Sequence, residues 1–287
     1  YMFYNSEKLS KENAMISLPI VDSPLKTTDE VEIKFPQNPR QWNMSTDARR
    51  VPEYTLRGFL NSILPMPLRT AFLGLDADEN PLLFDLMDPR PGSILIVSDR
   101  DAGKIRLVKT LLYSLIFTNP AYEIQFSLIS ARTSQWKFEY DRYKEYFSHF
   151  TNNYDHPAGK AILDEADWVE SRQHGRNEGE CRILILDGFD TLPYMDFDIR
   201  LNFEWLLEEG PYYQVWPIVM MDSRTAAEEK KWVEKFKTRI VGRLKDHHLG
   251  GEISGLPTLN SSTLLNGKEF VVKIGSREHH FYLPDSI

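Results

Sequence analysis

From Gly92 onward the sequence alternates short aliphatic runs with longer amphipathic runs, and this alternation limits the fold more than any other feature. The aliphatic runs are continuous rather than half polar, as is typical of strands buried on both faces. They are SILIV, EIQFSLIS, RILILD and WPIVMMD, and the helical runs between them include GKIRLVKTLLYSLIF, FEWLLEE and AAEEKKWVEKF. The pattern predicts an α/β fold, with a mostly parallel sheet and helices on both of its faces.

Two further segments predict hairpins at the edges of this sheet. In residues 70–86, two apolar runs flank an Asp-Ala-Asp-Glu-Asn turn, and the tail FVVKIG-SRE-HHFYL follows a short predicted strand in RIVGRL. Residues 1–66 instead contain scattered prolines and one alternating stretch, at 31–35. We therefore predict an irregular lead-in with short strands over 1–66 and a single domain over 67–287.

Composition bears on membrane insertion, DNA binding and cellular location. The 287 residues, 41% of them hydrophobic, can close a large core, yet no run approaches the roughly 20 apolar residues of a membrane-spanning helix. The net charge of −8 gives no support to DNA binding, which would need a local basic patch or a ring of subunits. Cys181 is the single cysteine, so it forms no internal disulfide. We expect a cytoplasmic location and no membrane in this segment, although the chain could be a piece of a longer membrane-tethered protein.

The loop after SILIV has the context of a phosphate-binding loop. Residues 98–105, Ser-Asp-Arg-Asp-Ala-Gly-Lys-Ile, connect a predicted strand to a strongly amphipathic helix. In such a loop the glycines let backbone N–H groups surround a phosphate, and the lysine reaches the outer phosphates. Gly103 and Lys104 match these roles, which makes Asp101, Ala102, Gly103, Lys104 and Ile105 the candidate nucleotide-binding residues.

Several positions of this loop depart from a working site. Ser98 and Asp101 stand where glycines are usual, and Ile105 replaces the Ser or Thr whose hydroxyl holds magnesium. Asp99 and Asp101 would also bring negative charge close to a polyphosphate. We expect ATP or ADP to bind weakly at best, with magnesium doubtful. On the Gly-Lys dipeptide alone, an ordinary helix start after a turn is the simpler alternative.

The run RILILD ends in a carboxylate, as expected of the residue that holds the magnesium shell beside a phosphate-binding loop. Asp187 is therefore the candidate metal ligand, a weak one. In hydrolytic relatives a glutamate follows this aspartate and activates water, but Gly188 follows it here. Asp190 could replace the glutamate only if the turn brought it within about 3 Å of the water. No residue is a firm catalytic candidate.

Other suggestive residues have simpler readings. Asp164-Glu165-Ala166-Asp167 spells a helicase motif, but Ile162, Ala166 and Val169 share one face of a helix, which favours an ordinary helix with mostly solvated acids. The adjacent histidine pairs and two tryptophans are expected in loops, strands or the core rather than in metal or base-stacking sites. They are His247-His248, His279-His280, Trp205 and Trp216.

Taken together, these segments resemble the motor domain of the FtsK/SpoIIIE and HerA translocases and of the related type VII secretion ATPases. The resemblance covers about residues 70–283 and is most specific in LLYSLIFTNP and DGFDTL. It implies a RecA-like P-loop NTPase fold, a three-layer sandwich, in a homo- or hetero-oligomer that moves DNA or protein. It also assigns Gly103 and Lys104 to the phosphates, Asp187 to the metal and Arg224 to a polar sensing position. Arg239, in Thr-Arg-Ile, matches a sequence typical of the family.

Two functions remain open at this stage. The first is a catalytically impaired module, a pseudo-ATPase that serves as a structural or regulatory subunit of a translocase or secretion-type assembly; the losses at Ile105 and Gly188 favour it. The second is a weak or assembly-dependent ATPase that translocates DNA, with missing groups supplied by a neighbouring subunit.

Overall fold

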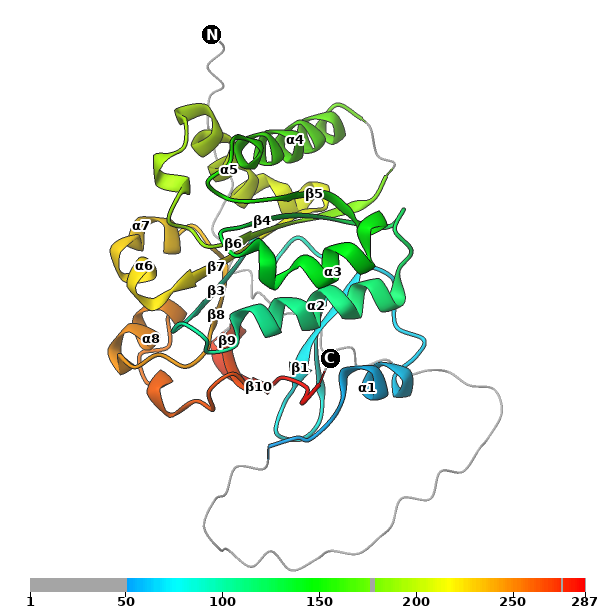
Figure 1. Cartoon of the computed structure of the whole chain (residues 1–287). Coiled ribbons are helices and arrows are strands. Elements are labelled where there is room, and N and C mark those ends of the chain that lie inside the picture. The colour runs from blue at the N-terminus through cyan, green and yellow to red at the C-terminus, as the bar shows by residue number, and fades with distance from the viewer. Residues whose placement is uncertain (1–50, 176–178, 275, 287) are drawn as a thin grey trace, which may run out of the picture.

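Ten strands form one sheet in the computed structural model, which describes residues 51–175, 179–274 and 276–286 (Figure 1). From edge to edge the strands are β2 (Pro81–Asp85), β1 (Thr70–Leu75), β10 (Arg277–Tyr282), β9 (Glu269–Ile274), β8 (Thr238–Val241), β3 (Ile94–Ser98), β7 (Val215–Asp222), β6 (Cys181–Asp187), β4 (Ile124–Ser130) and β5 (Phe147–Thr151). The strands from β8 to β5 are parallel, and the others pair antiparallel. The predicted mostly parallel sheet is confirmed.

The central strands are buried on both faces, which explains why their sequences are aliphatic throughout. Every residue of β3 is buried, and within β6 only Arg182 is partly exposed. Cys181, at the start of β6, is a buried free thiol.

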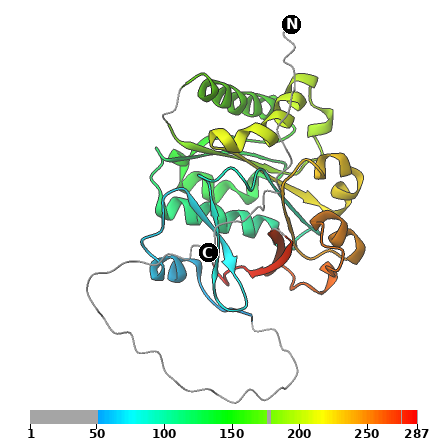
Figure 2. The same ribbon diagram turned by 180° about the vertical axis from the view of Figure 1, so that it is seen from behind.

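Helices cover both faces of the sheet (Figures 1 and 2). On one face, Leu107 and Leu111 of α2 (Lys104–Thr118) pack in the same core cluster as Ile96, and the short α3 (Lys137–Arg142) lies beside α2. On the other face, α4 (His156–Gln173) and α5 (Phe197–Glu209) form a separate core with Leu186. The small helices α6 (Ser223–Glu228), α7 (Lys230–Val233) and α8 (His247–Ser254) contribute to this second core. The result is the expected three-layer α/β arrangement.

Both predicted hairpins are present, and they extend the parallel sheet at β8. In the β1–β2 turn, the Asp76 carboxylate accepts the N–H groups of Asp78 at 2.9 Å and Asn80 at 2.8 Å, so the side chain itself closes the turn. β9 and β10 pair antiparallel, with β9 beside β8 and β10 beside β1.

The segment before the first hairpin contains a helix where loops and short strands were expected. Helix α1 (Leu56–Ser62) begins after Thr55, whose side chain accepts the N–H of Gly58. Leu56 and Leu60 are buried in a cluster with Phe72. The alternating stretch at 31–35 lies outside the described residues.

Two helical predictions need correction. The run AAEEKKWVEKF forms two short helices, α6 and α7, because the chain turns at Glu229. The helix predicted over residues 161–170 is confirmed within α4, but Glu165 is fully buried rather than solvated. The Ser127 hydroxyl donates to Glu165 at 2.5 Å, and Arg182 lies 3.7 Å from its other oxygen. Burial raises the pKa of Glu165, and Arg182 opposes this effect.

The tryptophans and histidines named in the sequence analysis lie in the core, in a helix or in a strand. Trp216 is fully buried, and Trp205 of α5 packs against the core. His248 lies in α8, and His280 in β10 bonds to two glutamates. In the part of the chain that the structure describes, no group of three or more His, Cys, Asp or Glu could hold a metal ion. No helix among the described residues is long and apolar enough to span a bilayer.

Candidate nucleotide site

Polar residues collect where the parallel strands end. Ser98, the last residue of β3, lies opposite Asp222 of β7, and Ser130, the last residue of β4, lies opposite Asp187 of β6. In open α/β sheets, ligands bind at this carboxyl edge because the loops that follow the strands converge there. The predicted phosphate loop and the predicted metal ligand are therefore brought to one edge.

The loop between β3 and α2 has the backbone conformation that its glycine positions would require. Asp101 has φ +60° and Gly103 has φ +95°, both in the left-handed region. Aspartate tolerates this region better than most residues, which explains how Asp101 occupies a position where glycine is usual. Gly103 is also needed for packing, because an added Cβ would lie 2.7 Å from the Cα of Gly267.

Lys104 is buried and fully engaged within the protein. Its Nζ donates to the carbonyl of Ser98 at 2.7 Å, the carbonyl of Asp99 at 3.0 Å and the carboxylate of Asp222 at 2.6 Å. Burial lowers the pKa of Lys104, and the hydrogen bond to Asp222 opposes this effect. An ammonium group has three protons, so an incoming phosphate must displace one of these partners.

The Asp99 carboxylate is held by hydrogen bonds from two distant parts of the chain. Its carboxylate accepts the Ser223 hydroxyl at 2.6 Å and the backbone N–H of Lys245 at 2.8 Å. These bonds tie the phosphate loop to the start of α6 and to the loop after β8. Asp99 is therefore an anchor of the loop, and Asp101 is the acid that lines the pocket beside Lys104.

Asp187 is 1% exposed, and both oxygens of its carboxylate accept hydrogen bonds from the protein. Arg132 donates to Oδ1 at 2.8 Å, while the Ser130 hydroxyl at 2.7 Å and the indole N–H of Trp136 at 3.0 Å both donate to Oδ2. Burial would lower the pKa of Arg132, but the charge of Asp187 holds it above its ordinary value. A guanidinium thus lies where the resemblance predicted a metal.

Magnesium does not fit this donor set. A hard cation needs several free oxygen ligands, but both oxygens of Asp187 already accept hydrogen bonds. Ile105 brings an aliphatic side chain to the position of the expected hydroxyl.

The residue after Asp187, where a catalytic glutamate was expected, has a backbone conformation that does not suit glutamate. Gly188 has φ +106°, a conformation that glycine adopts readily and glutamate does not. Asp190 is exposed and accepts the Tyr154 hydroxyl at 3.4 Å, and it does not line the pocket beside Lys104. The structure therefore does not bring Asp190 to the candidate phosphate site.

A cavity of about 410 Å³ opens beside Lys104, and cations dominate its lining. Arg106, Lys109 and Arg132 line it together with Lys104, and Asp101 is its one acid. Sequence reasoning missed all three of the additional cations. Arg106 and Lys109 follow Lys104 on the first turns of α2, a signal that was available, whereas Arg132 comes from the loop after β4.

Two candidates taken from the family resemblance lie elsewhere. The Arg224 side chain is 87% exposed and pairs with Glu228 within α6, and it does not line this cavity. Arg239 donates to the carbonyls of Phe236 and Ile253, which is a structural role beneath α8.

Solved structures share this fold. ATPases 2 and 3 of EssC from Geobacillus thermodenitrificans match at TM-score 0.66 and 14% identity, over 82% of this chain and 45% of that one. The cytoplasmic domain of the Thermomonospora curvata type VII secretion ATPase EccC matches at TM-score 0.61 and 17% identity, over 81% and 32%. The pCW3 conjugation coupling protein TcpA, in its monomer form with ATPgS, matches at TM-score 0.59 and 14% identity, over 78% and 68%.

The protein therefore has the RecA-like P-loop ATPase fold, and the resemblance to FtsK/HerA-type domains is confirmed at the level of the fold. The chain spans less than half the length of the EssC and EccC structures it matches. No protein-family model matches the sequence, and comparison with curated proteins found no match.

Proposed function

We propose that this protein is an FtsK-like P-loop module with an impaired nucleotide site, and that it serves as a structural or regulatory subunit of a translocase or secretion-type assembly. The ion pair between Arg132 and Asp187 carries the proposal. A magnesium ion could bind Asp187 only by competing with the Arg132 guanidinium for one buried carboxylate.

The same site supports a weak, metal-independent interaction with phosphates. Lys104 and the backbone N–H groups at the start of α2 would hold the phosphate groups, with Arg106 and Lys109 close to the entrance. Because Arg132 already supplies a fixed positive charge, a bound nucleotide would gain little from magnesium. ATP or ADP is thus a weak ligand in this proposal, and hydrolysis is not expected, since Gly188 occupies the position of the base and has no side chain.

Work within an assembly is the natural role for such a module. The structures it resembles include ATPase domains of secretion and conjugation proteins, and this chain matches only part of the EssC and EccC structures. We therefore propose protein subunits, of the same or another kind, as partners, in the cytoplasm. The net charge of −8 gives DNA no general support.

The deciding experiment is calorimetric titration of the full chain with ATP, once with magnesium and once with a chelator. We expect weak binding that differs little between the two conditions and is lost in Lys104→Ala. Tight binding that requires magnesium would contradict the proposal, because it would need Asp187 to exchange Arg132 for the metal.

An assembly-dependent ATPase is the second candidate, and the retained Lys104 with its cationic cavity favours it. A neighbouring subunit could supply the missing base or an arginine. Its signature is phosphate release from ATP that rises with added DNA and vanishes in Lys104→Ala. With no release above background, with and without DNA, the impaired module remains.

A further inference from the structure

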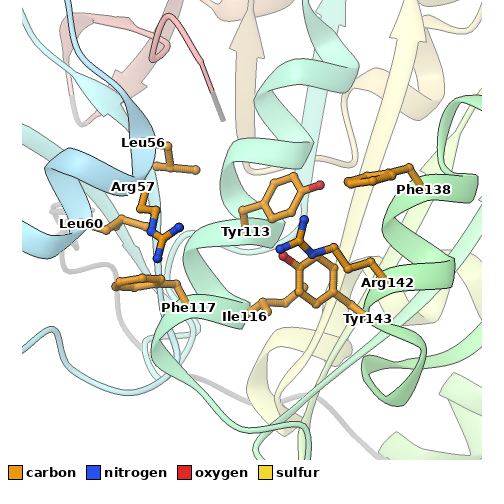
Figure 3. Close-up of a pocket in the computed structure, with 9 residues that line it drawn as sticks. All are labelled: Leu56, Arg57, Leu60, Tyr113, Ile116, Phe117, Phe138, Arg142 and Tyr143. Carbon is orange, nitrogen blue, oxygen red and sulfur yellow. The ribbon is translucent and has the colours of Figure 1, made fainter.

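A groove of about 610 Å³ lies between α1, α2 and α3, on the face of the sheet that α2 covers (Figure 3). Its floor comes from α2, and its two walls come from α1 and α3. Cavities of this size are typical of ligand and peptide sites. The lining residues are Leu56, Arg57, Leu60, Tyr113, Ile116, Phe117, Phe138, Arg142 and Tyr143.

Large apolar side chains are left open to solvent along this groove. Phe138 is 61% exposed and Phe117 is 39% exposed, and neither belongs to a core cluster. Contiguous exposed apolar surface rimmed by polar groups marks interaction sites in soluble proteins. Aromatic residues and arginine are also the types that contribute most to binding at protein interfaces.

The floor of the groove and its α3 wall are held together by specific contacts. The Tyr113 hydroxyl donates to the buried Glu139 at 3.0 Å, and the Tyr113 and Tyr143 rings meet edge to face at 5.7 Å. Glu139 is held in turn by Lys109 at 2.8 Å. A preformed surface of this kind loses little conformational entropy when a partner binds.

Two guanidinium groups flank the apolar floor from opposite walls. Arg57 lies on the α1 side, and Arg142 extends from α3 toward α2 (Figure 3). Arg142 stacks over the rings of Phe138 at 5.8 Å and Tyr143 at 5.4 Å. Within the described residues neither arginine forms an ion pair with a carboxylate, even though acids outnumber bases in this chain.

We propose that this groove binds a segment of a partner protein in which aliphatic or aromatic side chains alternate with carboxylates. The apolar side chains would cover Phe138, Phe117 and Ile116, and the carboxylates would pair with Arg57 and Arg142. Such pairs would be charge-assisted and stacked on aromatic rings, a setting that selects carboxylates over neutral groups. The site is separate from the cavity beside Lys104.

The test uses the full chain and two short fluorescent synthetic peptides. In the first peptide Glu alternates with Leu and Phe, and in the second Lys replaces every Glu. Fluorescence anisotropy measures each affinity. We expect the acidic peptide to bind at least about tenfold more tightly than the basic one.

Matched variants then place the binding. Phe138→Ser and Arg142→Glu should each weaken the acidic peptide about tenfold. Phe197→Ser and Lys160→Glu are the controls, because Phe197 is as exposed, at 67%, and both residues lie on the helices of the opposite face. Arg142→Glu should also bind the basic peptide better than the unchanged protein does, which a folding defect would not produce.

Three results would overturn the proposal. Equal affinity for both peptides, or affinity untouched by Phe138→Ser and Arg142→Glu, would remove the groove as a site for acidic segments. Self-association that is lost in Phe138→Ser, with no peptide binding, would assign the groove to a second copy. Binding that is seen only after removal of residues 1–50 would assign it to this chain's own N-terminal segment.

Discussion

The guanidinium of Arg132 lies 2.8 Å from the Asp187 carboxylate at the carboxyl edge of the sheet. The two residues come from neighbouring strands, Asp187 at the end of β6 and Arg132 just after β4. Their contact places a cation at the carboxylate for which the family resemblance predicts a metal.

Restoring the missing hydroxyl alone should not restore a metal site. In Ile105→Thr, we expect ATP affinity to remain independent of magnesium, because Arg132 still occupies Asp187. In the double variant Ile105→Thr with Arg132→Ala, one oxygen of Asp187 becomes available beside a hydroxyl, and affinity should become magnesium dependent. Titrations with magnesium and with a chelator measure both. Magnesium dependence in the single variant would mean that the ion pair opens easily.

Removing the cation should destabilise the fold. Arg132→Ala leaves Asp187 buried without its charged partner, and we expect the free energy of unfolding to fall by about 1–3 kcal/mol. Urea denaturation measures this loss. Arg224→Ala is the control, because its pair with Glu228 is exposed to solvent and should contribute little to stability. Equal effects in the two variants would argue against a structural role for the Arg132 pair.

A glutamate placed at the position of the lost base should not create an ATPase. Gly188 has φ +106°, so Gly188→Glu strains the backbone, and an added Cβ would lie 3.6 Å from the Asn153 amide nitrogen and 3.7 Å from an Asp190 carboxylate oxygen. We expect no phosphate release and a loss of about 1–2 kcal/mol in unfolding free energy.

Gly175→Ala is the comparison for this loss, since Gly175 has φ +98° and no neighbour within 4 Å of an added Cβ. A similar loss in both variants assigns the effect to the backbone. Phosphate release in Gly188→Glu that disappears on adding Lys104→Ala would show that the side chain does reach the site.

The pair of β10 and β9 should make stability depend on pH. Hydrogen bonds from His280 to Glu269 at 2.7 Å, and to Glu278 at 2.5 Å, raise the pKa of His280 although burial opposes them. A raised pKa in the folded state stabilises the protein fully below the ordinary value of about 6.5 and ceases to do so as pH rises through the folded value.

His280→Gln should therefore cost more unfolding free energy near about pH 5.5 than near about pH 8.5. Denaturation curves of the variant and the unchanged protein at both values give the comparison. In a Glu269→Gln background, the cost of His280→Gln should differ less between the two pH values, because the charged partner of His280 at Nδ1 is gone. A cost that is equal at both values would show that the pair does not hold the proton.

Much of the fold was predictable because it rests on local patterns. The aliphatic runs formed strands, the run from Lys104 formed a helix, and the Asp76 turn closed a hairpin. The candidate phosphate loop and Asp187 could be singled out because polar residues directly follow buried strands. Both patterns depend on neighbours within a few positions, which the sequence displays directly.

The chemistry of the site was less predictable because it depends on contacts between distant residues. Arg132 and Asp187 are 55 positions apart, and Asp99 meets Ser223 across 124 positions. The sequence did not show that Asp99 anchors its loop, or that Arg132 already pairs with Asp187. The burial of Glu165 escaped for the same reason, because its partner Ser127 lies on β4.

The linear order of residues was enough to specify the elements, their α/β class and the loss of the hydroxyl and the glutamate, because each follows from side-chain types at short spacing. Only the tertiary structure decided which donors surround Asp187, which groups accept the hydrogen bonds of the Lys104 ammonium, and that φ at Gly188 is positive. Those features arise when strands far apart in the chain become neighbours in one sheet, where burial favours polar groups that have hydrogen-bond partners.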